Sequence, residues 1–366
     1  MKIMYVITKA DIGGAQTHLI QLANYFSHKH EVIVAVGSKG PMLNAFNNKV
    51  QVIQLEHLKG PILFKEDIFG VKELESLIAL IQPDILHLHS SKAGALGRLA
   101  QRYAHTTHTK VLFTAHSWAF TEGVNPLKRV AFKLIEKYLL KSTDKVICVS
   151  DYDRKLAILN HFDKDKLCTI HNSVAQPKDN VLAAIQTKPQ KPVEFVMVAR
   201  FAYPKMHQAV IEAVKLLKDS TDQSFNMTFI GDGGTFKENI ALAASLGLND
   251  IITFKGNVDH VRATLHQYHV FILMSKHEGL PISIIEAMSE GLPIIASNVG
   301  GISQLVEDNG ILLDQNTPYE LAQAMQSFLD TETIQSKARA SYKKYEAEFT
   351  ENKMMKKLER IYEPSH

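Results

Sequence analysis

The sequence predicts an α/β protein built of two doubly wound domains in tandem. Short apolar runs of strand length alternate with helical patterns along the chain, which is typical of parallel sheets covered by helices on both faces. The series of strands is interrupted once, near the middle, by a stretch that contains three prolines. A chain of 366 residues is also long enough for two domains that each bury a core.

The first half carries seven strand-like apolar runs, with helical patterns between most of them. These runs predict strands at residues 2–8, 31–36, 50–55, 85–89, 111–116, 145–150 and 167–170.

The proline-containing stretch at residues 172–192 has no strand-like core and is interpreted as the inter-domain region, with the linker itself at 176–189. The predicted domains are therefore 1–175 and 190–347. A charged helix at about 348–366 ends the chain and need not pack on the domain that precedes it in sequence. Six strands are predicted in the second domain, at residues 193–200, 226–231, 252–256, 270–275, 293–297 and 310–313.

Composition excludes several classes of protein. Hydrophobic residues make up 45% of the chain and charged residues 22%, which is typical of a soluble globular protein, and the net charge of +3 is too small to indicate nucleic-acid binding. Cys148 and Cys168 lie in apolar runs and are expected to be free thiols in a reducing compartment rather than a disulfide. The N-terminal apolar run is too short for a signal peptide and is broken by Lys9 and Asp11. We therefore expect a cytosolic protein.

Ligands of doubly wound sheets bind at the carboxyl ends of the strands, so the motifs there decide the function. In the run TKADIGGAQTHL, Gly13 and Gly14 are expected to form a tight turn before a helix, whose backbone N–H groups suit a diphosphate; simple turn glycines are the alternative. The motif is not GxGxxG, and no acidic residue ends the strand at 31–36, which argues against a nicotinamide-binding domain.

Two cations follow the first strand of the second domain. Arg200 and Lys205 are placed to neutralise charge that develops on a leaving phosphate, although a solvated surface pair is the more common reading of such residues taken alone. In FIGDGG, Gly231, Gly233 and Gly234 keep the backbone close to whatever binds after that strand.

The run EGLPISIIE supplies two carboxylates. Glu278 and Gly279 form a turn, and the N–H groups of Gly279 and Leu280 are expected to face a phosphate at a helix start. Glu286 lies among apolar residues, where an unpaired carboxylate is costly, so it needs a hydrogen-bond donor. A ribose diol fits this need, and a protein N–H or a lysine is the alternative.

Two sequence patterns have the spacing of metal ligands, but each is better explained without a metal. Asp151 and Asp153 have the spacing of a manganese-binding DxD motif, but they follow a strand and open a helix, which favours Asp151 as an N-cap. His87 and His89 share a strand face without a third ligand in register, which favours a polar strand end over a metal site. No metal is expected.

Residues 125–142 form a basic amphipathic helix. Ordinary core packing with a solvated basic face is one reading, and docking on an anionic membrane surface is the other. The apolar side comprises Leu127, Val130, Ala131, Leu134, Ile135 and Leu139, and the basic residues are Lys128, Arg129, Lys133, Lys137 and Lys141.

Taken together, these motifs resemble a known family. EGLPISIIE is similar to the two-glutamate signature of the retaining family-4 glycosyltransferases of the GT-B fold, and the resemblance covers the whole chain. The GG turn, PDILHLHSSKAG, TAHSW, VARFAYPK, GDG and GLPIIASNVGG follow the order found in that family. The resemblance implies two Rossmann-like domains facing a central cleft, an N-terminal acceptor domain, a C-terminal donor domain and a last helix that crosses back to the first domain.

The resemblance also implies roles for single residues. Arg200 and Lys205 would hold the donor diphosphate with the backbone at Gly14, Glu286 would bind the ribose, and Glu278 would contact the transferred sugar. His116 matches the strand-end histidine near that sugar, with Gly279, Leu280 and Gly231 on the nucleotide side and Gly13, Ser90 and Ser91 on the acceptor side. One departure is that the family usually has glycine after the lysine, where this chain has Met206.

The function implied is retaining transfer of a sugar from a nucleotide-sugar, with UDP favoured over GDP. The acceptor would be a lipid-linked glycan of capsule or other surface polysaccharide synthesis, reached by a same-face substitution without a cofactor. We expect the protein at the inner face of the cell membrane, in contact with anionic lipid through residues 125–142. A sugar-nucleotide epimerase of the same fold and a non-catalytic nucleotide-binding assembly partner are the alternatives.

Overall fold

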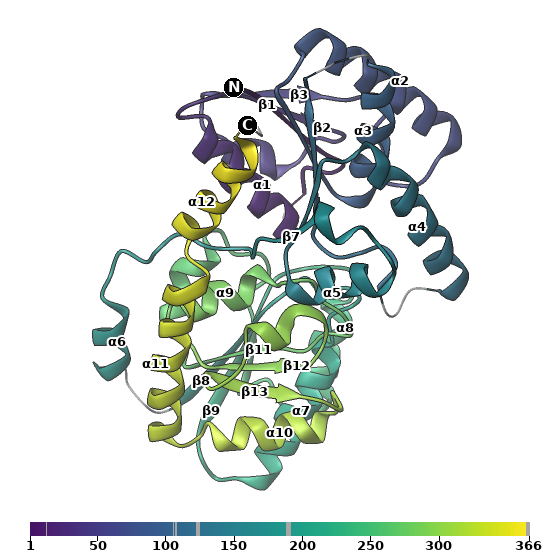
Figure 1. The fold of residues 1–366 in the computed structure, drawn as a ribbon. Coiled ribbons are helices and arrows are strands. Elements are labelled where there is room, and N and C mark those ends of the chain that lie inside the picture. The colour runs from purple at the N-terminus through teal and green to yellow at the C-terminus, as the bar shows by residue number, and fades with distance from the viewer. Residues whose placement is uncertain (12, 105, 107, 122–124, 188–191, 364–366) are drawn as a thin grey trace. The chain divides into compact units, whose positions relative to one another are not determined.

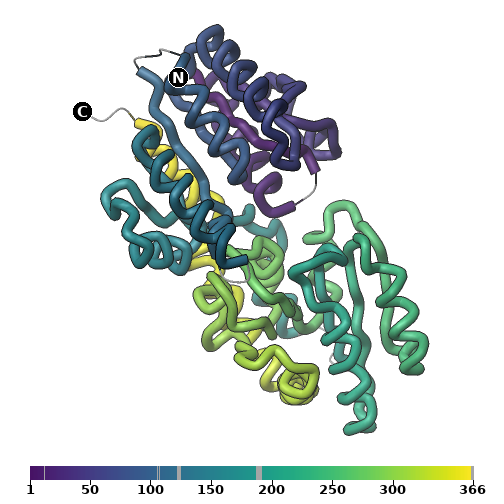
Figure 2. The backbone as a smooth tube through the Cα atoms, turned by 90° about the vertical axis from the view of Figure 1, so that its right-hand side faces the viewer, coloured from purple at the N-terminus to yellow at the C-terminus, as the bar shows by residue number. Residues whose placement is uncertain are grey.

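The computed structural model describes residues 1–11, 13–104, 106, 108–121, 125–187 and 192–363. The chain divides into two compact units. Unit 1 comprises Met1–His171 together with Met354–His366, and unit 2 comprises Asn172–Lys353. Both ends of the chain therefore belong to unit 1 (Figures 1 and 2).

Unit 1 contains a seven-stranded sheet in which every pairing is parallel, in the order β3-β2-β1-β4-β5-β6-β7. All seven strands predicted for the first half are present, and each strand end lies within two residues of its predicted position. Their bounds are β1 (Lys2–Ile7), β2 (Glu31–Val36), β3 (Val50–Gln54), β4 (Ile85–His89), β5 (Lys110–Ala115), β6 (Lys145–Cys148) and β7 (Leu167–Thr169).

Helices cover both faces of this sheet (Figure 1). One core layer contains residues of α2 and α3, and the other contains residues of α1 and α12. The α-helices are α1 (Gly14–Phe26), α2 (Phe64–Ile81), α3 (Ser91–Tyr103), α4 (Pro126–Leu139), α5 (Asp151–Leu159) and α12 (Glu351–Tyr362), and the 3-10 helices are η1 (Pro41–Ala45), η2 (Leu140–Ser142) and η3 (Lys164–Lys166).

The last helix, α12, packs in unit 1, as expected. Met354, Met355 and Leu358 are buried in the core layer that α1 also enters. The ring of Tyr362 stacks on Phe26 of α1 with centroids 4.7 Å apart. Burial of these apolar side chains is what attaches the end of the chain to the first sheet.

Unit 2 contains a six-stranded sheet, again entirely parallel, in the order β10-β9-β8-β11-β12-β13. The six predicted strands are all present, as β8 (Val193–Val198), β9 (Phe225–Ile230), β10 (Ile252–Phe254), β11 (Val270–Leu273), β12 (Ile294–Ser297) and β13 (Gly310–Leu313). The helices are α6 (Val181–Thr187), α7 (His207–Ser220), α8 (Phe236–Ser245), η4 (Val261–Gln267), α9 (Ile282–Ser289), η5 (Gly300–Gln304), α10 (Pro318–Ser327) and α11 (Thr331–Glu348).

The boundary between the units differs in detail from the predicted linker at 176–189. Unit 2 begins at Asn172, and α6 lies inside the stretch that was expected to be a linker. Val181 and Ile185 are buried against Ala338 of α11. This tertiary contact gives the segment a packed side, which the local sequence with its three prolines does not indicate. Residues 188 and 189 lie outside the described residues.

The strand order places the motifs. In each sheet the order reverses beside the first strand, between β1 and β4 in unit 1 and between β8 and β11 in unit 2. Open α/β sheets bind their ligands at such switch points, outside the carboxyl ends of the strands. Among the described residues, no helix is long and apolar enough to cross a membrane.

Candidate functional site

At the switch point of unit 2, the loop after β8 runs along the end of β11. The N–H of Met206 donates to the Met274 carbonyl oxygen (3.0 Å), and the N–H of Lys276 donates to the Pro204 carbonyl oxygen (3.1 Å). This pairing brings the Nζ of Lys205 to the Oε1 of Glu278, and the two form an ion pair. The Lys205 side chain is 18% exposed and the Glu278 side chain is 13% exposed. Two residues separated by 73 positions therefore meet at the carboxyl ends of the neighbouring strands β8 and β11.

Met206 fits this loop without glycine. Its φ is −113° and its ψ is 55°, and it stands just before the first residue of α7. A negative φ is open to any L-residue. The departure from the family pattern at this position therefore does not prevent Lys205 from reaching Glu278.

Arg200 lies exposed just beyond the end of β8 and makes no ion pair within the part of the chain that the structure describes. Gly231 packs its backbone against Ala199, the residue before Arg200. Gly231 has φ +134°, and a Cβ there would stand 2.2 Å from the Ala199 carbonyl oxygen, so a larger residue would displace the strand end. The arginine is thus an unpaired cation at the same sheet edge as Lys205.

The turn at Glu278 is supported from two sides. The N–H of Gly301 donates to the Gly279 carbonyl oxygen (2.9 Å), and the Nδ2 of Asn172 donates to the Leu280 carbonyl oxygen (2.7 Å). These bonds use carbonyl oxygens only. Within the described residues, the N–H groups of Gly279 and Leu280 make no hydrogen bond, so they remain able to donate to an anion before α9.

Sequence reasoning assigned no role to Gly300 or Asn172. Gly300 has φ +57°, and a Cβ there would stand 1.8 Å from the Glu278 carbonyl oxygen, so the loop after β12 touches the glutamate turn. The paired glycines of the run NVGG could have indicated this close approach of two backbone segments. Asn172 carried no signal, because it begins the stretch that was interpreted as the inter-domain region.

Glu286 is half-buried in α9. Burial raises the pKa of its carboxyl to about 7; the positive charge of Arg262 opposes the shift, and the negative charge of Glu290 adds to it. The Arg262 guanidinium itself bonds elsewhere, to Glu290 (3.2 Å) and Ser289 (3.1 Å). Among the described residues, the Glu286 carboxyl has no hydrogen-bond partner, so it remains open to a ligand that donates hydroxyl groups. Sequence reasoning missed Arg262, which lies in the 3-10 helix η4.

In unit 1, α1 begins at Gly14 without a side-chain N-cap. The backbone before it differs from the expected tight turn: Gly13 has φ 174° and ψ 171°, which is extended. A Cβ at Gly13 would meet only the flexible side chain of Gln16. The N–H groups of the first turn of α1 are therefore free to bind a ligand. The backbone angles at position 13 do not require a glycine.

Ser90 and Ser91 mark the start of α3, at the end of β4. The hydroxyls of Ser90 and Thr8 are 2.7 Å apart, which ties the carboxyl ends of β1 and β4 together. Ser90 has φ +70°, a conformation that few residues other than glycine adopt. Ser91 is exposed and is the first helical residue.

His116 follows β5 and belongs to a group of histidines at the carboxyl edge of the first sheet. Its Nε2 lies 3.1 Å from the Nδ1 of His89, and its ring meets that of His18 edge to face with centroids 5.2 Å apart. Desolvation is the main cause that lowers the pKa values of His87, His89 and His116 well below the usual range, and neighbouring histidines add to it.

Both ring nitrogens of His87 are occupied by protein groups. Nδ1 lies 2.6 Å from the Tyr362 hydroxyl, and Nε2 lies 2.7 Å from the Thr114 hydroxyl. His87 therefore has no ring nitrogen left for a metal. No cluster of three or more His, Cys, Asp or Glu side chains suited to a metal occurs among the residues that the structure describes.

The helix at Asp151 is capped one residue earlier than expected. Ser150 is the N-cap of α5, because its hydroxyl accepts from the N–H of Asp153, while Asp151 is the first helical residue. The carboxyl of Asp153 is buried beside the same hydroxyl, and burial raises its pKa to about 6. Cys148 and Cys168 are free thiols.

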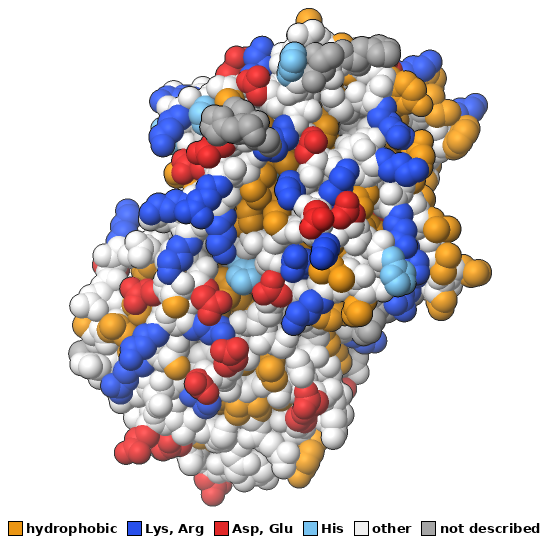
Figure 3. Space-filling view, viewed as in Figure 1, with side chains coloured by type: hydrophobic (Ala, Val, Ile, Leu, Met, Phe, Trp, Pro, Cys, Tyr) orange, Lys and Arg blue, Asp and Glu red, His pale blue; other side chains and the backbone are white. Residues whose placement is uncertain are grey.

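Helix α4 exposes most of its apolar side, for which the sequence allowed either core packing or membrane docking. Leu127 is 82% exposed and Leu134 is 60% exposed, and Val130, Ile135 and Tyr138 are also exposed. The reading as ordinary core packing is therefore wrong for these residues, whereas Leu139 is buried. In Figure 3, hydrophobic side chains lie next to lysine and arginine side chains at the surface over α2 and α4.

A polar contact anchors α4 instead. The Nη2 of Arg98 on α3 donates to the Oε2 of Glu136 on α4 (2.8 Å), and both residues are buried. The guanidinium also lies over the ring of Phe113, 4.3 Å from its centroid. This anchor fixes the inner side of the helix and leaves the apolar side toward solvent.

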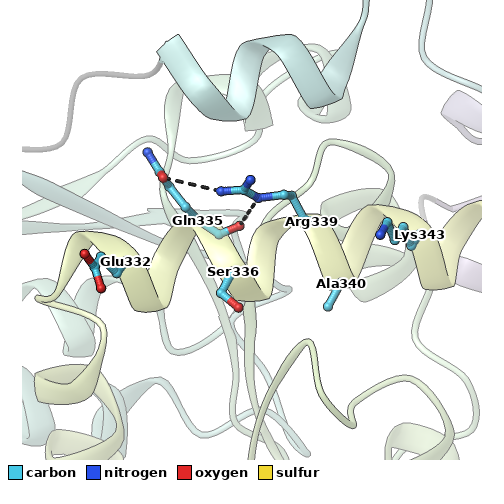
Figure 4. A pocket seen from close by; sticks show the side chains of 6 residues that line it. All are labelled: Glu332, Gln335, Ser336, Arg339, Ala340 and Lys343. Atoms are coloured by element: carbon cyan, nitrogen blue, oxygen red, sulfur yellow. Dashed lines mark hydrogen bonds between the residues drawn. The ribbon is translucent and has the colours of Figure 1, made fainter.

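A hollow of about 440 Å³ lies elsewhere, on the surface of α11 (Figure 4). Arg339 bonds back to Gln335 of the same helix, to its carbonyl oxygen (3.2 Å) and its Oε1 (3.5 Å). The described lining consists of Glu332, Gln335, Ser336, Arg339, Ala340 and Lys343. None of these is a predicted site residue, and the hollow is not at a strand end.

Both halves of the chain match known family models. Residues 12–175 match the family model described as Glycosyltransferase Family 4, and residues 179–349 match the model described as Glycosyl transferases group 1. The chain belongs to the family-4 glycosyltransferases. The enzyme activity that both family models and the names of the relatives indicate is glycosyl transfer.

The relatives include two Escherichia coli enzymes. The O-antigen biosynthesis glycosyltransferase WbnH is 28% identical over 328 residues, which cover 89% of each chain. The UDP-Gal:alpha-D-GlcNAc-diphosphoundecaprenol alpha-1,3-galactosyltransferase is 26% identical over 86% of this chain and 84% of its own. Both span nearly the whole glycosyltransferase, so the similarity is not confined to one unit.

Among solved structures, Anabaena HepE in complex with UDP-glucose superimposes with a TM-score of 0.81 at 17% identity, covering 99% of each chain. Sucrose-phosphate synthase from Thermosynechococcus elongatus gives a TM-score of 0.80 at 20% identity, covering 99% of this chain and 98% of its own. At such identities the likeness concerns the fold alone. The fold of this glycosyltransferase is GT-B.

Proposed function

We propose that this glycosyltransferase moves a sugar, with retention of anomeric configuration, from a UDP-sugar to a lipid-linked glycan intermediate of surface polysaccharide synthesis. The observation that carries the donor site is the arrangement at the switch point of unit 2. The Lys205–Glu278 ion pair, the unpaired Arg200 and the open N–H groups at Gly279 and Leu280 belong to that sheet edge. The unpartnered carboxyl of Glu286 lies in α9, the helix that follows β11. Cations and N–H groups suit a diphosphate, and the carboxylate suits a ribose diol.

The names of two relatives support the choice of substrates. The E. coli galactosyltransferase is named for a UDP-sugar donor and a diphosphoundecaprenol acceptor. A Campylobacter jejuni relative, 24% identical over 91% of this chain, is likewise named for an undecaprenol-linked acceptor. We therefore propose a polyprenyl-diphosphate-linked glycan as the acceptor here, used at the cytoplasmic face of the membrane.

The proposed reaction is a same-face substitution that needs no metal. The bond from the anomeric carbon to the diphosphate oxygen breaks as the acceptor hydroxyl oxygen bonds to that carbon, and the hydroxyl proton passes to the leaving diphosphate. Lys205 and Arg200 stabilise the negative charge that develops on that diphosphate. Glu286 holds the ribose, Glu278 holds the transferred sugar, and His116 donates or accepts a hydrogen bond at a sugar hydroxyl.

Transfer is tested with purified protein, a panel of UDP- and GDP-sugars, a polyprenyl-diphosphate-linked acceptor and excess EDTA. The proposal expects release of UDP coupled to a product in which proton NMR finds the anomeric configuration of the donor. An inverted product, or activity that EDTA abolishes, would contradict the proposed mechanism. Release of GDP in place of UDP would move the donor assignment to GDP.

We further propose that α4 docks on an anionic membrane surface. Its exposed apolar side chains alternate with basic residues, which is the pattern of a helix that lies in the lipid interface. Lysine and arginine near such a surface contribute about 1 kcal/mol each through anionic lipid. The basic residues supply the charge complementarity, and the apolar side supplies the buried area.

Vesicle sedimentation tests this docking. Wild type should bind vesicles that contain phosphatidylglycerol more strongly than vesicles of phosphatidylcholine alone, and Leu127→Ser should weaken that binding. Leu80→Ser is the matched control, because Leu80 lies on α2 with the same exposed fraction of 82%. Equal binding by both variants, or binding that ignores lipid charge, would refute the role of α4.

A further inference from the structure

The hydrogen bond between His89 and His116 constrains the tautomers of both rings. His89 ends β4 and is fully buried, and its Nδ1 lies 3.1 Å from the Nε2 of His116, which follows β5 and is partly exposed. The ring of His89 is held in turn by His87, with ring centroids 4.4 Å apart. Because His87 is bonded at both nitrogens, to Tyr362 and Thr114, this support is itself fixed.

Both members of the pair are neutral imidazoles, since burial lowers the pKa values of His89 and His116 and the adjoining histidines lower them further. A neutral imidazole carries its hydrogen on one nitrogen only. One ring must therefore donate and the other accept, and the choice fixes the tautomer of both.

The second nitrogen of His89 decides between the two arrangements. Its Nε2 is buried and has no hydrogen-bond partner among the described residues. If His116 donated, the His89 hydrogen would stand on that Nε2 as a buried unpaired N–H. If His89 donates from Nδ1, only a lone pair is left there. Orphaned buried N–H groups are rarer than under-satisfied acceptors, which favours the second arrangement.

We infer that His89 is a positioning residue that donates from Nδ1 to the Nε2 of His116 and thereby holds His116 as its Nδ1–H tautomer. His116 then offers a hydrogen-bond donor, and no lone pair, at its remaining nitrogen. That Nδ1 has no partner within the described part of the chain. Resting on the proposed function, the inference makes His116 a donor to a hydroxyl oxygen of the transferred sugar and excludes it as a general base in its neutral form.

Nitrogen NMR tests the tautomer without any substrate. In protein labelled with ¹⁵N-histidine, long-range proton–nitrogen correlations should show His116 with a protonated Nδ1 and a bare Nε2, and His89 with the same pattern. His89→Phe should release His116 from the Nδ1–H tautomer, and His89→Asn, whose amide nitrogen stands near the place of Nδ1, should restore it. His28→Asn, at an exposed histidine of the same unit, should leave the His116 signals unchanged.

An Nε2–H tautomer of His116 in the wild type would overturn the inference, whether or not the variants fold. Retention of the Nδ1–H form in a folded His89→Phe protein would overturn it as well.

Kinetics separate this inference from the proposed function. His89→Phe should lower kcat for sugar transfer about tenfold, the worth of one hydrogen bond, and His89→Asn should recover most of it, with UDP affinity unchanged in both. If the NMR shows the expected tautomer shift while transfer is unaffected, the proposed contact of His116 with the sugar fails and the positioning by His89 stands.

Discussion

Lys205 and Glu278 form an ion pair in which the lysine comes from the loop after β8 and the glutamate from the loop after β11. The strand order makes them neighbours, because β8 and β11 pair directly at the switch point. In the absence of a ligand, the glutamate compensates the lysine. A bound diphosphate would offer the lysine a second anion, so the pair keeps the cation in place until the donor arrives.

A double-mutant cycle on this pair should show that the two side chains are coupled. Lys205→Met leaves Glu278 largely buried without its partner, and Glu278→Gln leaves Lys205 in the same state, so each single change should lower the melting temperature. The double variant should recover part of the loss, with a coupling energy of about 1 kcal/mol. Calorimetric melting of the four proteins measures it. Additive losses would show that the two side chains do not interact.

Glu286 should make nucleotide affinity depend on pH. Ribose hydroxyls donate to an ionised carboxylate, and burial has raised its pKa to about 7, so binding must remove a proton at lower pH. Affinity for UDP should therefore rise about tenfold from pH 6 to pH 8. Calorimetric titration measures this, and Glu286→Gln reports the part that comes from the nucleotide's own phosphate. A Gln variant with the full pH dependence would contradict the ribose role.

The same carboxyl should act oppositely on stability. Its pKa is raised in the folded chain, so its contribution to stability is present below the ordinary carboxyl range and is lost as pH rises toward 7 and above. Glu286→Gln should therefore raise the melting temperature of the ligand-free protein at pH 8 and change it little at pH 4.5. Equal effects at both pH values would show that the carboxyl is not strained in the folded state.

Gly300 should tolerate no side chain. Gly300 and Gly247 both have left-handed backbone angles, with φ +57° and +67°, but a Cβ meets the Glu278 carbonyl oxygen at 1.8 Å in the first case and open space in the second. Gly247→Ala should cost about 1 kcal/mol from backbone strain alone. Gly300→Ala should cost more and should also lower kcat, because it displaces the Glu278 turn. Calorimetry and the transfer assay compare them; equal losses would refute the contact.

The Arg98–Glu136 pair should stabilise unit 1. Glu136→Ala leaves a buried guanidinium without its carboxylate and should cost about 3 kcal/mol, whereas Arg98→Met with Glu136→Leu should recover much of it. Trp118, the single tryptophan, lies in the core of this unit, so its fluorescence reports the urea transition. Asp11→Ala breaks an exposed pair with Lys9 and should cost less than about 0.5 kcal/mol. Similar losses of unfolding free energy in Glu136→Ala and Asp11→Ala would show that the buried pair stabilises unit 1 no more than the exposed pair does.

The fold was predictable because its signal is local. Each strand is a short apolar run between helical patterns, and a run such as VFILMS at 270–275 reads as a buried strand on its own. Helix α6 was not predictable in the same way. Val181 and Ile185 acquire a packed side from Ala338 and Tyr342, more than 150 positions away, and no local sequence pattern indicates such a contact.

The candidate site was predictable as far as residue types and strand ends allow. Lys205 and Glu278 were both named, but their pairing depends on β8 lying next to β11. Gly300 and Arg262 act through contacts with other elements, so their chemistry is visible only in three dimensions. The apolar side of α4 was recognised, yet its exposure depends on what the rest of unit 1 leaves uncovered.

Calorimetric titration of UDP and GDP into wild type and Glu286→Ala, without added metal, tests the nucleotide site at the switch point of unit 2. We expect micromolar binding of UDP by the wild type, weaker binding of GDP, and loss of most of the UDP affinity in the variant. Absence of binding by a folded wild type, or equal affinity of wild type and variant, would contradict the proposed site.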